Sequence, residues 1–253
     1  MIYITGDVHA DFSKFSTKRF PEQKHITKKD FVIVCGDFGI WEDNSSERYW
    51  LDWLEKKNFT ILFVDGNHSN FDRLYSKEFP IINYHGGKAH KIRDNIFHLM
   101  RGYIFKLEGK TFFTFGGAQS HDIQDGILRL QDYKSLSDLV KDYNSRTRQG
   151  QMLRIEHLSW WKQELPSKKE MDRGIKNLEK NNFKVDYVIT HCPPHEVCKW
   201  CGYYDTDKLI DYFDEILSRG LNFIQWWSGH LHKNQYGIYT KYNIVYHDFI
   251  RIV

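Results

Sequence analysis

Carboxylate, imidazole and amide side chains recur in five short motifs that are spread almost from end to end of this 253-residue chain. The motifs are Asp7-Val-His9, Gly36-Asp37, Gly66-Asn67-His68, His191 in Thr-His-Cys-Pro-Pro, and Gly229-His230-Leu-His232. Asp, His and Asn together suit a hard-to-borderline divalent metal ion, or two of them. The motifs therefore predict a metal-dependent hydrolase.

Each motif follows a hydrophobic run that is typical of a buried strand. The runs are Ile2-Tyr3-Ile4, Phe31–Val34, Ile61–Val64, Val188-Ile189 and the aromatic run Phe223–Trp227. Open α/β sheets place their sites at the carboxyl ends of strands, so we expect the motifs to meet in one crevice. A lone Gly-Asp is more often a turn, but five motifs in this context favour a two-metal site.

Two cations held about 3.5–4 Å apart repel each other, so a bridging carboxylate must lie between them. Asp37 is the natural bridge. The first metal would be completed by Asp7, His9 and one histidine of the last motif. The second would be completed by Asn67, His191 and the other histidine.

Such a centre predicts hydrolysis of a phosphoester. A water bridging both metals would be acidified toward neutral pH and could attack phosphorus in line. His68 is not needed as a ligand because its neighbour Asn67 already points inward. It could protonate the leaving alkoxide or stabilise the developing negative charge.

The order of these motifs resembles the calcineurin-like metallophosphoesterase superfamily, over essentially the whole chain from Asp7 to His232. The resemblance implies an α/β fold, a four-layer α-β-β-α sandwich of two mixed sheets, with a dinuclear metal site at the strand ends. It implies two divalent ions, Mn²⁺ before Fe, Zn or Ni, and His68 as the catalytic histidine. It also implies a division of ligands: Asp7, His9, Asp37 and His232 on one metal; Asp37, Asn67, His191 and His230 on the other.

The chain departs from the protein Ser/Thr phosphatases of this superfamily. Those enzymes follow Gly-Asp with a further Asp and an Arg-Gly, and they place Arg before Gly-Asn-His-Glu. Here Asp37 is followed by Phe-Gly-Ile, and Asp65 precedes Gly66-Asn67-His68-Ser69. The carboxylate that would orient His68 and the arginine that would clamp a phosphoserine are both absent. These differences count against a protein phosphatase and leave the partner of His68 open.

Composition indicates an ordinary globular protein, with 27% charged and 41% hydrophobic residues. The net charge of +3 does not indicate nucleic-acid binding. No stretch approaches the roughly 20 apolar residues of a membrane span, and no signal peptide is recognised, so we expect a cytoplasmic protein without membrane contact. Nothing in the sequence indicates the oligomeric state.

Sequence patterns predict several further elements. A helix is expected over 44–57, capped by Asn44 with Glu47 at the capping-box position. A second helix would begin at Thr206 and end at Gly220, and a third would begin at Ser167 with Glu170. A hairpin is expected over 103–117 and a second strand pair over 236–250.

We expect a single domain, 1–253, with a polar, partly helical insertion at about 119–184. It could fold over the crevice and grip a second charge of the substrate, with Arg129, Arg154 and His121 as candidate contacts. A solvated flap with ordinary surface arginines is an equal alternative. Gly116-Gly117-Ala118, Arg154 and Trp160-Trp161 look like features of related sequences. The tryptophan pair favours packing over base stacking.

Cys198-Lys-Trp-Cys201 has the spacing of half a zinc site and would need Cys192 or His195 as well. Free thiols are the favoured interpretation, because the ligand set is incomplete.

These patterns favour a phosphoesterase that acts on a phosphate mono- or diester of a small molecule or nucleotide. A nuclease-like phosphodiesterase acting on nucleic-acid ends is one alternative, but it would need a basic, aromatic-lined groove, and no dense basic run is present. A non-catalytic binding scaffold is another, and the complete ligand set with His68 counts against it.

Overall fold

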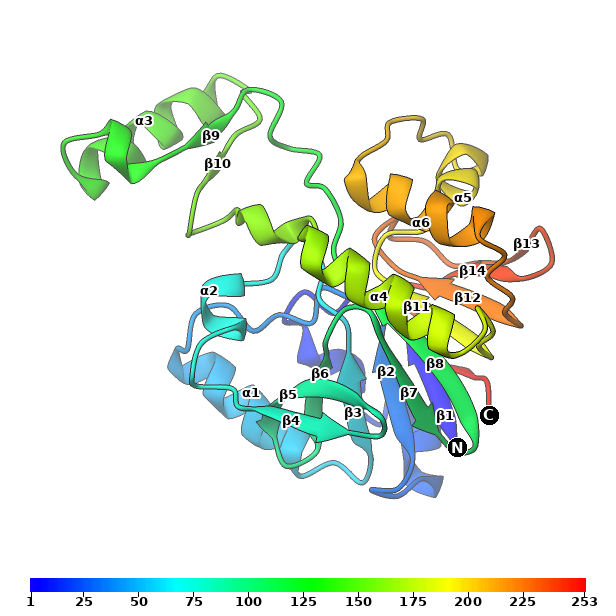
Figure 1. Cartoon of the computed structure of the whole chain (residues 1–253). Coiled ribbons are helices and arrows are strands. Elements are labelled where there is room, and N and C mark those ends of the chain that lie inside the picture. Colours follow the sequence, from blue (N-terminus) through cyan, green and yellow to red (C-terminus); the bar gives the residue numbers. More distant parts are fainter.

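Two mixed β-sheets face each other in the computed structural model, which describes all residues 1–253 (Figure 1). The first sheet has the order β15-β1-β2-β3-β6-β5-β4. Its strands are β1 Ile2–Thr5, β2 Phe31–Val34, β3 Thr60–Phe63, β4 Ile81–Tyr84, β5 Gly87–Arg93, β6 Ile96–Leu99 and β15 Ile250–Arg251. Its central strands β1, β2, β3 and β6 run parallel, and its edge pairs are antiparallel.

The second sheet has the order β13-β14-β12-β11-β8-β7. Its strands are β7 Tyr103–Leu107, β8 Lys110–Phe115, β11 Tyr187–Thr190, β12 Gln225–Ser228, β13 Gln235–Ile238 and β14 Tyr242–Ile244. Here too the four central strands are parallel and both edges are antiparallel. Parallel strands bring their carboxyl ends to one edge, which is what the site requires.

Helices cover the outer face of each sheet. Helices α1 Ser45–Glu55 and α2 Phe71–Leu74 and the 3-10 helices Phe12–Phe15 and Pro21–His25 lie with the first sheet; α4 Lys168–Lys180, α5 His195–Trp200 and α6 Lys208–Ser218 lie with the second. A third apolar cluster, which includes Ile4, Ile33, Leu62, Ile189 and Trp227, fills the space between the sheets. The predicted four-layer α-β-β-α sandwich is confirmed.

Local signals located helices α1, α4 and α6 and the strands that precede the motifs. Asn44 caps α1, although Glu47 does not close a capping box, because its carboxylate accepts from the Trp41 amide and pairs with Arg73. Ser167 and Glu170 form the expected capping box of α4. The expected hairpin over 103–117 is the β7–β8 pair.

Two predicted boundaries were wrong. Helix α6 is capped by Asp207 and not by Thr206, because the Asp207 carboxylate accepts from the amides of Leu209 and Ile210. Segment 236–250 is not one strand pair. Strands β13 and β14 do pair, but β15 crosses to the first sheet and pairs with β1.

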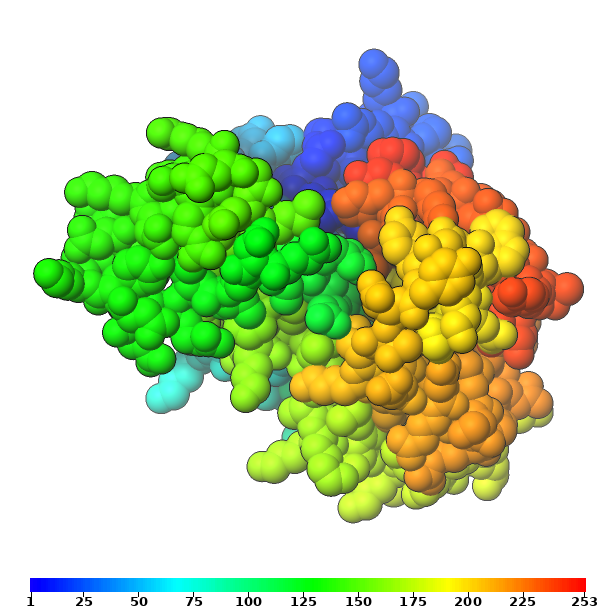
Figure 2. Space-filling view, turned by 90° about the horizontal axis from the view of Figure 1, so that it is seen from above, coloured from blue at the N-terminus to red at the C-terminus, as the bar shows by residue number.

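The first part of the expected insertion 119–184 projects as an arm, residues 123–156, which stands out from the rest of the molecule in green (Figure 2). It holds the short strands β9 Ile127–Leu128 and β10 Arg154–Ile155, the 3-10 helix Leu130–Asp132 and helix α3 Leu136–Arg148, which the sequence patterns did not predict. The 3-10 helix Lys162–Glu164 follows it. By contrast, α4 lies against β7 and belongs to the core of the second sheet, through Leu178.

The arm has a small apolar core of its own, formed by Leu128, Leu139, Leu153 and Ile155. That the chain forms a single domain with an insertion at about 119–184 stays a prediction. No helix of the structure is long and apolar enough to cross a lipid bilayer.

The separate core of the arm yields a stability prediction. Leu139→Ala removes its central side chain, and such truncations cost about 2–5 kcal/mol. Because this core shares no residue with the three large clusters, we expect faster amide hydrogen exchange within 127–155 and unchanged exchange in β1, β2 and β11. Leu136→Ala is the matched control, since that side chain in the same helix is 50% exposed. Faster exchange across both sheets would contradict independent packing.

Candidate metal centre

The five motifs follow the strands from which they were expected to project. Asp7 follows β1, Asp37 follows β2 and Asn67 follows β3 in the first sheet. His191 directly follows β11 and His230 follows β12 in the second sheet. All five strands are central and parallel within their sheets, so their side chains gather where the two sheets end together.

Asp7, His9 and His232 form a first group of converging ligand atoms. The Nε2 atoms of His9 and His232 lie 2.9 Å apart, and Asp7 Oδ2 lies 3.6 Å from the former and 3.1 Å from the latter. Ligands bound about 2.1 Å from one cation are separated by about 3–3.5 Å. Asp7 Oδ2 is buried and has no hydrogen-bond partner. The group therefore fits a divalent cation.

A second group surrounds His191. Its Nε2 atom lies 3.2 Å from both Asp37 Oδ2 and Asn67 Oδ1. Its Nδ1 atom lies 2.8 Å from the Cys35 carbonyl oxygen, a contact that directs Nε2 toward the centre. Asp37 Oδ2 is also 3.9 Å from His9 Nε2, so this oxygen lies between the two groups, where a bridging ligand would be.

His230 lies beside His191, as expected, and has His121 as a further neighbour. Its Nε2 atom lies 3.1 Å from His121 Nε2, and its ring centroid is 4.9 Å from that of His191. His121 is thus brought to the centre from the segment that follows β8. In the sequence, the only indication that His121 lies near the centre was its position after the Gly-Gly turn.

The charges at the centre are strongly coupled. Burial by itself raises the pKa of Asp7 and of Asp37, but the charge of His191 and the hydrogen bonds and charges of the neighbouring histidines together outweigh it, and both pKa values lie below their usual range. Burial lowers the pKa of His191, yet Asp37 and Asp7 together raise it to about 9. In the protein without metal, a proton on His191 therefore balances part of the buried negative charge, and a cation would replace it.

Glycines let the chain lie against the two carboxylates. A Cβ atom on Gly66 would come 2.1 Å from Asp37 Oδ1, and one on Gly229 would come 2.1 Å from Asp7 Oδ1. The backbone is also strained here, since positive φ angles of 44–66° occur at His9, Asp37, His230 and His232. Such strain persists only where the surrounding structure enforces it.

A buried hydrogen-bond chain orients Asn67. The Asn67 amide donates to Ser120 Oγ at 3.3 Å, and Ser120 Oγ donates to Glu164 Oε2 at 2.6 Å. Glu164 Oε1 also accepts from the Ser120 amide at 3.1 Å. With its nitrogen held in this way, the Asn67 oxygen faces His191. The sequence analysis did not identify the supporting role of Ser120 and Glu164, because neither residue belongs to a recognisable motif.

Asp65 anchors the Gly-Asn-His loop from behind. Burial raises its pKa, but Arg101 and His98 outweigh burial and hold that pKa well below its usual range. Arg101 Nε donates to its Oδ2 at 2.9 Å, and His98 Nε2 lies 3.0 Å from its Oδ1. The Gly117 amide donates to the Asp65 carbonyl at 2.9 Å. Both carboxylate oxygens of Asp65 therefore have partners behind the loop, and Asp65 does not orient His68.

His68 lies half-buried at the cavity over the centre. Its amide donates to Asp37 Oδ1 at 2.9 Å, and its ring centroid is 5.5 Å from that of His9. Burial lowers its pKa; Asp37 opposes this, while Arg154 lowers it further.

The two candidate arginines differ in position. Arg154 Nε donates to Asp122 Oδ2 at 2.8 Å, and Asp122 lines the same cavity as His68. Arg129 pairs with Glu156 at 3.2 Å on the arm and lines neither cavity near the centre.

The cysteines at 192, 198 and 201 carry free thiols. Cys192 and Cys198 both donate to the Pro193 carbonyl oxygen, and His195 Nδ1 lies 3.2 Å from Asp214. Neither group of converging ligand atoms in the structure contains a thiol.

Comparison with known proteins adds one strong match. A profile of the calcineurin-like phosphoesterase family matches residues 1–234. The chain has no match among curated proteins. Two solved structures resemble it distantly. The phosphopantetheinyl hydrolase of Mycobacterium tuberculosis has 15% identity over 97% of this chain and 89% of its own, with a TM-score of 0.41. A proposed 5'-nucleotidase of Staphylococcus aureus has 12% identity over 97% of this chain and 48% of its own, with a TM-score of 0.39.

The hydrogen bonds through Ser120 that orient Asn67 can be tested by measuring metal affinity. Ser120→Ala removes the oxygen that accepts from the Asn67 amide and frees that side chain to rotate. Loss of such a supporting contact typically costs about 10–100-fold in metal affinity, so we expect Mn²⁺ to bind more weakly by a factor in that range in calorimetric titration. Ser159→Ala is the matched control, because that hydroxyl lies on the same segment and accepts from the Ile155 amide. Equal affinities in both variants would contradict the positioning role.

Proposed function

The chain belongs to the calcineurin-like phosphoesterase family, and from that premise we propose that it hydrolyses a phosphate mono- or diester of a small molecule at a centre of two divalent ions. The family makes it a metal-dependent hydrolase of phosphoric esters. The observation that carries the proposal is the buried Asp7 Oδ2, which has no hydrogen-bond partner and faces the Nε2 atoms of His9 and His232.

The proposed ligands divide between two ions. Asp7, His9 and His232 would hold one ion; Asn67, His191 and His230 would hold the other. Asp37 would bridge them, which its distances to His9 and His191 support. When bound, the ions would neutralise phosphate charge and lower the pKa of an attacking water. A mixed set of carboxylate, amide and imidazole donors is compatible with Mn²⁺, our preferred metal.

We assign His68 to the leaving-group side of the reaction. Its lowered pKa favours a neutral ring near pH 7, and a neutral imidazole still carries one N–H donor. That donor would stabilise the charge that develops on the leaving oxygen, and the protonated form of the ring would be the one to pass a proton to it. The Asp37 contact to its backbone amide holds the loop in position.

The cavity over the centre supports a small substrate. Its lining includes Asp37, Asn67, His68 and Asp122, and it contains no Lys or Arg. A nuclease that tracks a phosphate backbone needs a continuous basic groove. The absence of Lys and Arg from the lining of this cavity therefore favours the small-molecule phosphoesterase over the nuclease-like alternative.

Loss of the bridging carboxylate should abolish hydrolysis. With Mn²⁺, we expect the wild-type chain to hydrolyse p-nitrophenyl phosphate or bis-p-nitrophenyl phosphate, and Asp37→Ala to lose at least about 10³-fold in kcat/KM. Metal analysis of the purified proteins should show two Mn²⁺ per wild-type chain and fewer in the variant. Chelation by EDTA should remove the activity, and Mn²⁺ should restore it.

Asp138→Ala is the control for this substitution, because that carboxylate lies on α3 in the arm. Two bound ions without hydrolysis of either ester would count against the proposed activity, and absence of bound metal would count against the centre itself.

His68→Gln should separate catalysis from metal binding. We expect kcat to fall by about 10²–10⁴-fold, the usual contribution of a positioned proton donor, with the metal content unchanged. His157→Gln is the matched control, since that ring is exposed and pairs with Asp72. A loss of bound metal in His68→Gln would instead identify His68 as a ligand.

A further inference from the structure

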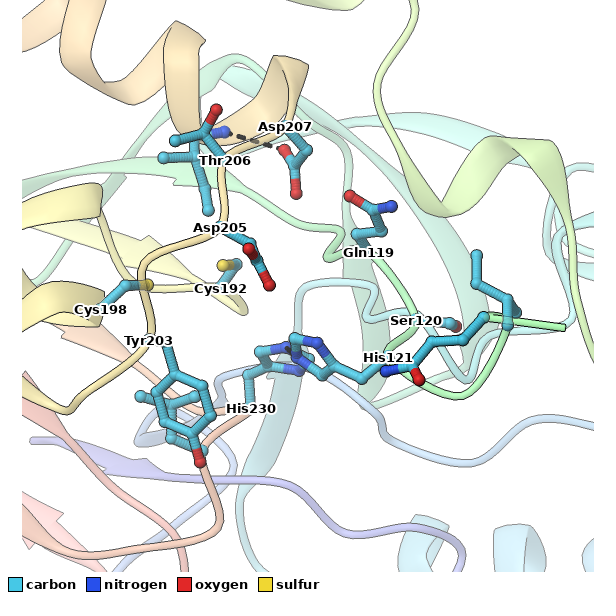
Figure 3. A pocket seen from close by; sticks show the side chains of 14 residues that line it. Gln119, Ser120, His121, Cys192, Cys198, Tyr203, Asp205, Thr206, Asp207 and His230 are labelled. Carbon is cyan, nitrogen blue, oxygen red and sulfur yellow. Dashed lines mark hydrogen bonds between the residues drawn. The ribbon is translucent and has the colours of Figure 1, made fainter. Parts of the chain in front are cut away.

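A second cavity opens beside the one over the metal centre (Figure 3). Its volume is about 510 Å³, within the range of small-molecule sites. The two cavities share four lining residues, His121, Tyr203, His230 and Leu231, and therefore adjoin each other. A single ester can place its phosphate over the centre and its other half in the second cavity.

We infer that this second cavity binds the leaving group of the ester, and that it selects an uncharged or cationic, ring-bearing group over one that carries further phosphate. The inference rests on the proposed function and names the substrate class of that same site.

The charged side chains that line this cavity are acidic. Its 14 lining residues contain no Lys or Arg, and the carboxylates among them are Asp205 and Asp207. Gln119, Gln124 and Thr206 add neutral hydrogen-bonding groups. A second phosphate would find no cation here and would be repelled by both carboxylates.

The start of α6 does not change this conclusion. A helix N-terminus can bind an anion through its free amides. Here the Asp207 carboxylate already accepts from the amides of Leu209 and Ile210, at 2.7 and 3.0 Å. An anionic ligand would have to displace a side chain of the protein itself.

The walls of the cavity combine aromatic rings with apolar side chains. Tyr203 lies over His121, with ring centroids 6.3 Å apart and planes inclined by 27°. Ile210, Leu231 and the buried Cys192 and Cys198 add apolar surface. Figure 3 shows Tyr203 and Asp205 on the same loop, facing the cavity, with His121 beside His230. A flat ring bearing polar groups matches an aromatic wall with neutral donors and acceptors nearby.

Aryl esters of different charge test the inference. The probes are phenyl phosphate and its 4-carboxy and 4-aminomethyl derivatives, each as the monoester and as the methyl diester, assayed with the Mn²⁺-loaded full chain. We expect Asp205→Asn to raise kcat/KM for the carboxy ester relative to the phenyl ester by about two- to fivefold. The same substitution should lower the relative value for the aminomethyl ester. Asp211→Asn, on α6 outside the cavity, is the matched control.

Tyr203→Ala should raise KM by about two- to tenfold for all the aryl esters, and Tyr203→Phe should retain most of the binding. Tyr204→Ala is the control, because that neighbouring ring does not line the cavity.

The outcomes separate the inference from the proposed function. Equal charge ratios in Asp205→Asn and Asp211→Asn, with hydrolysis intact, overturn the charge selection alone. An unchanged KM in Tyr203→Ala overturns the assignment of this cavity to the leaving group. Failure of the metal-loaded wild-type chain to hydrolyse any of the six esters overturns the proposed function, and the inference with it.

Discussion

Two buried carboxylates at the ends of neighbouring strands are the constraint on which the rest of the site depends. Asp7 and Asp37 each use one oxygen to accept a backbone amide, from His230 and His68 respectively, at 3.0 and 2.9 Å. Each then presents its second oxygen to the histidines. Negative charge so concentrated and buried is stable only beside protons or cations. The same contacts that hold the loops therefore define where positive charge must bind.

Support for this arrangement comes from one segment that is remote in the sequence. Arg101, which neutralises Asp65 behind the Gly-Asn-His loop, also donates to the Gln163 carbonyl oxygen at 2.8 Å. The next residue, Glu164, holds Ser120 and through it Asn67. Residues 120 and 164 flank the arm, so its two roots are tied to the loop that carries Asn67. The position of the arm and the geometry of the centre are thus linked by hydrogen bonds.

The sequence predicted the parts of the molecule that follow local rules. Buried strands and the motifs after them could be identified because apolar runs and strand ends are local signals. Helix α3 was missed because Leu139 is its one buried residue, and that residue packs against two strands of only two residues each. The contact between Ser120 and Glu164 could not be found, since it joins residues more than 40 positions apart, and the position of His121 after the Gly-Gly turn did not reveal its contact with His230. Such pairings depend on tertiary packing alone.

Arg129 and Arg154, the two candidate substrate contacts on the arm, each pair with a carboxylate of the protein. A substrate-gripping role needs a guanidinium that faces the cavity without a carboxylate partner. Arg129 instead pairs with Glu156, and Arg154 with Asp122. Asp122 holds Arg154 near enough to His68 to lower its pKa, but the pair adds little net charge to the cavity. This pairing agrees with our proposal that, beyond the phosphate, the site recognises its substrate through the rings, carboxylates and neutral hydrogen-bonding groups of the cavity lined by Tyr203, Asp205 and Gln119.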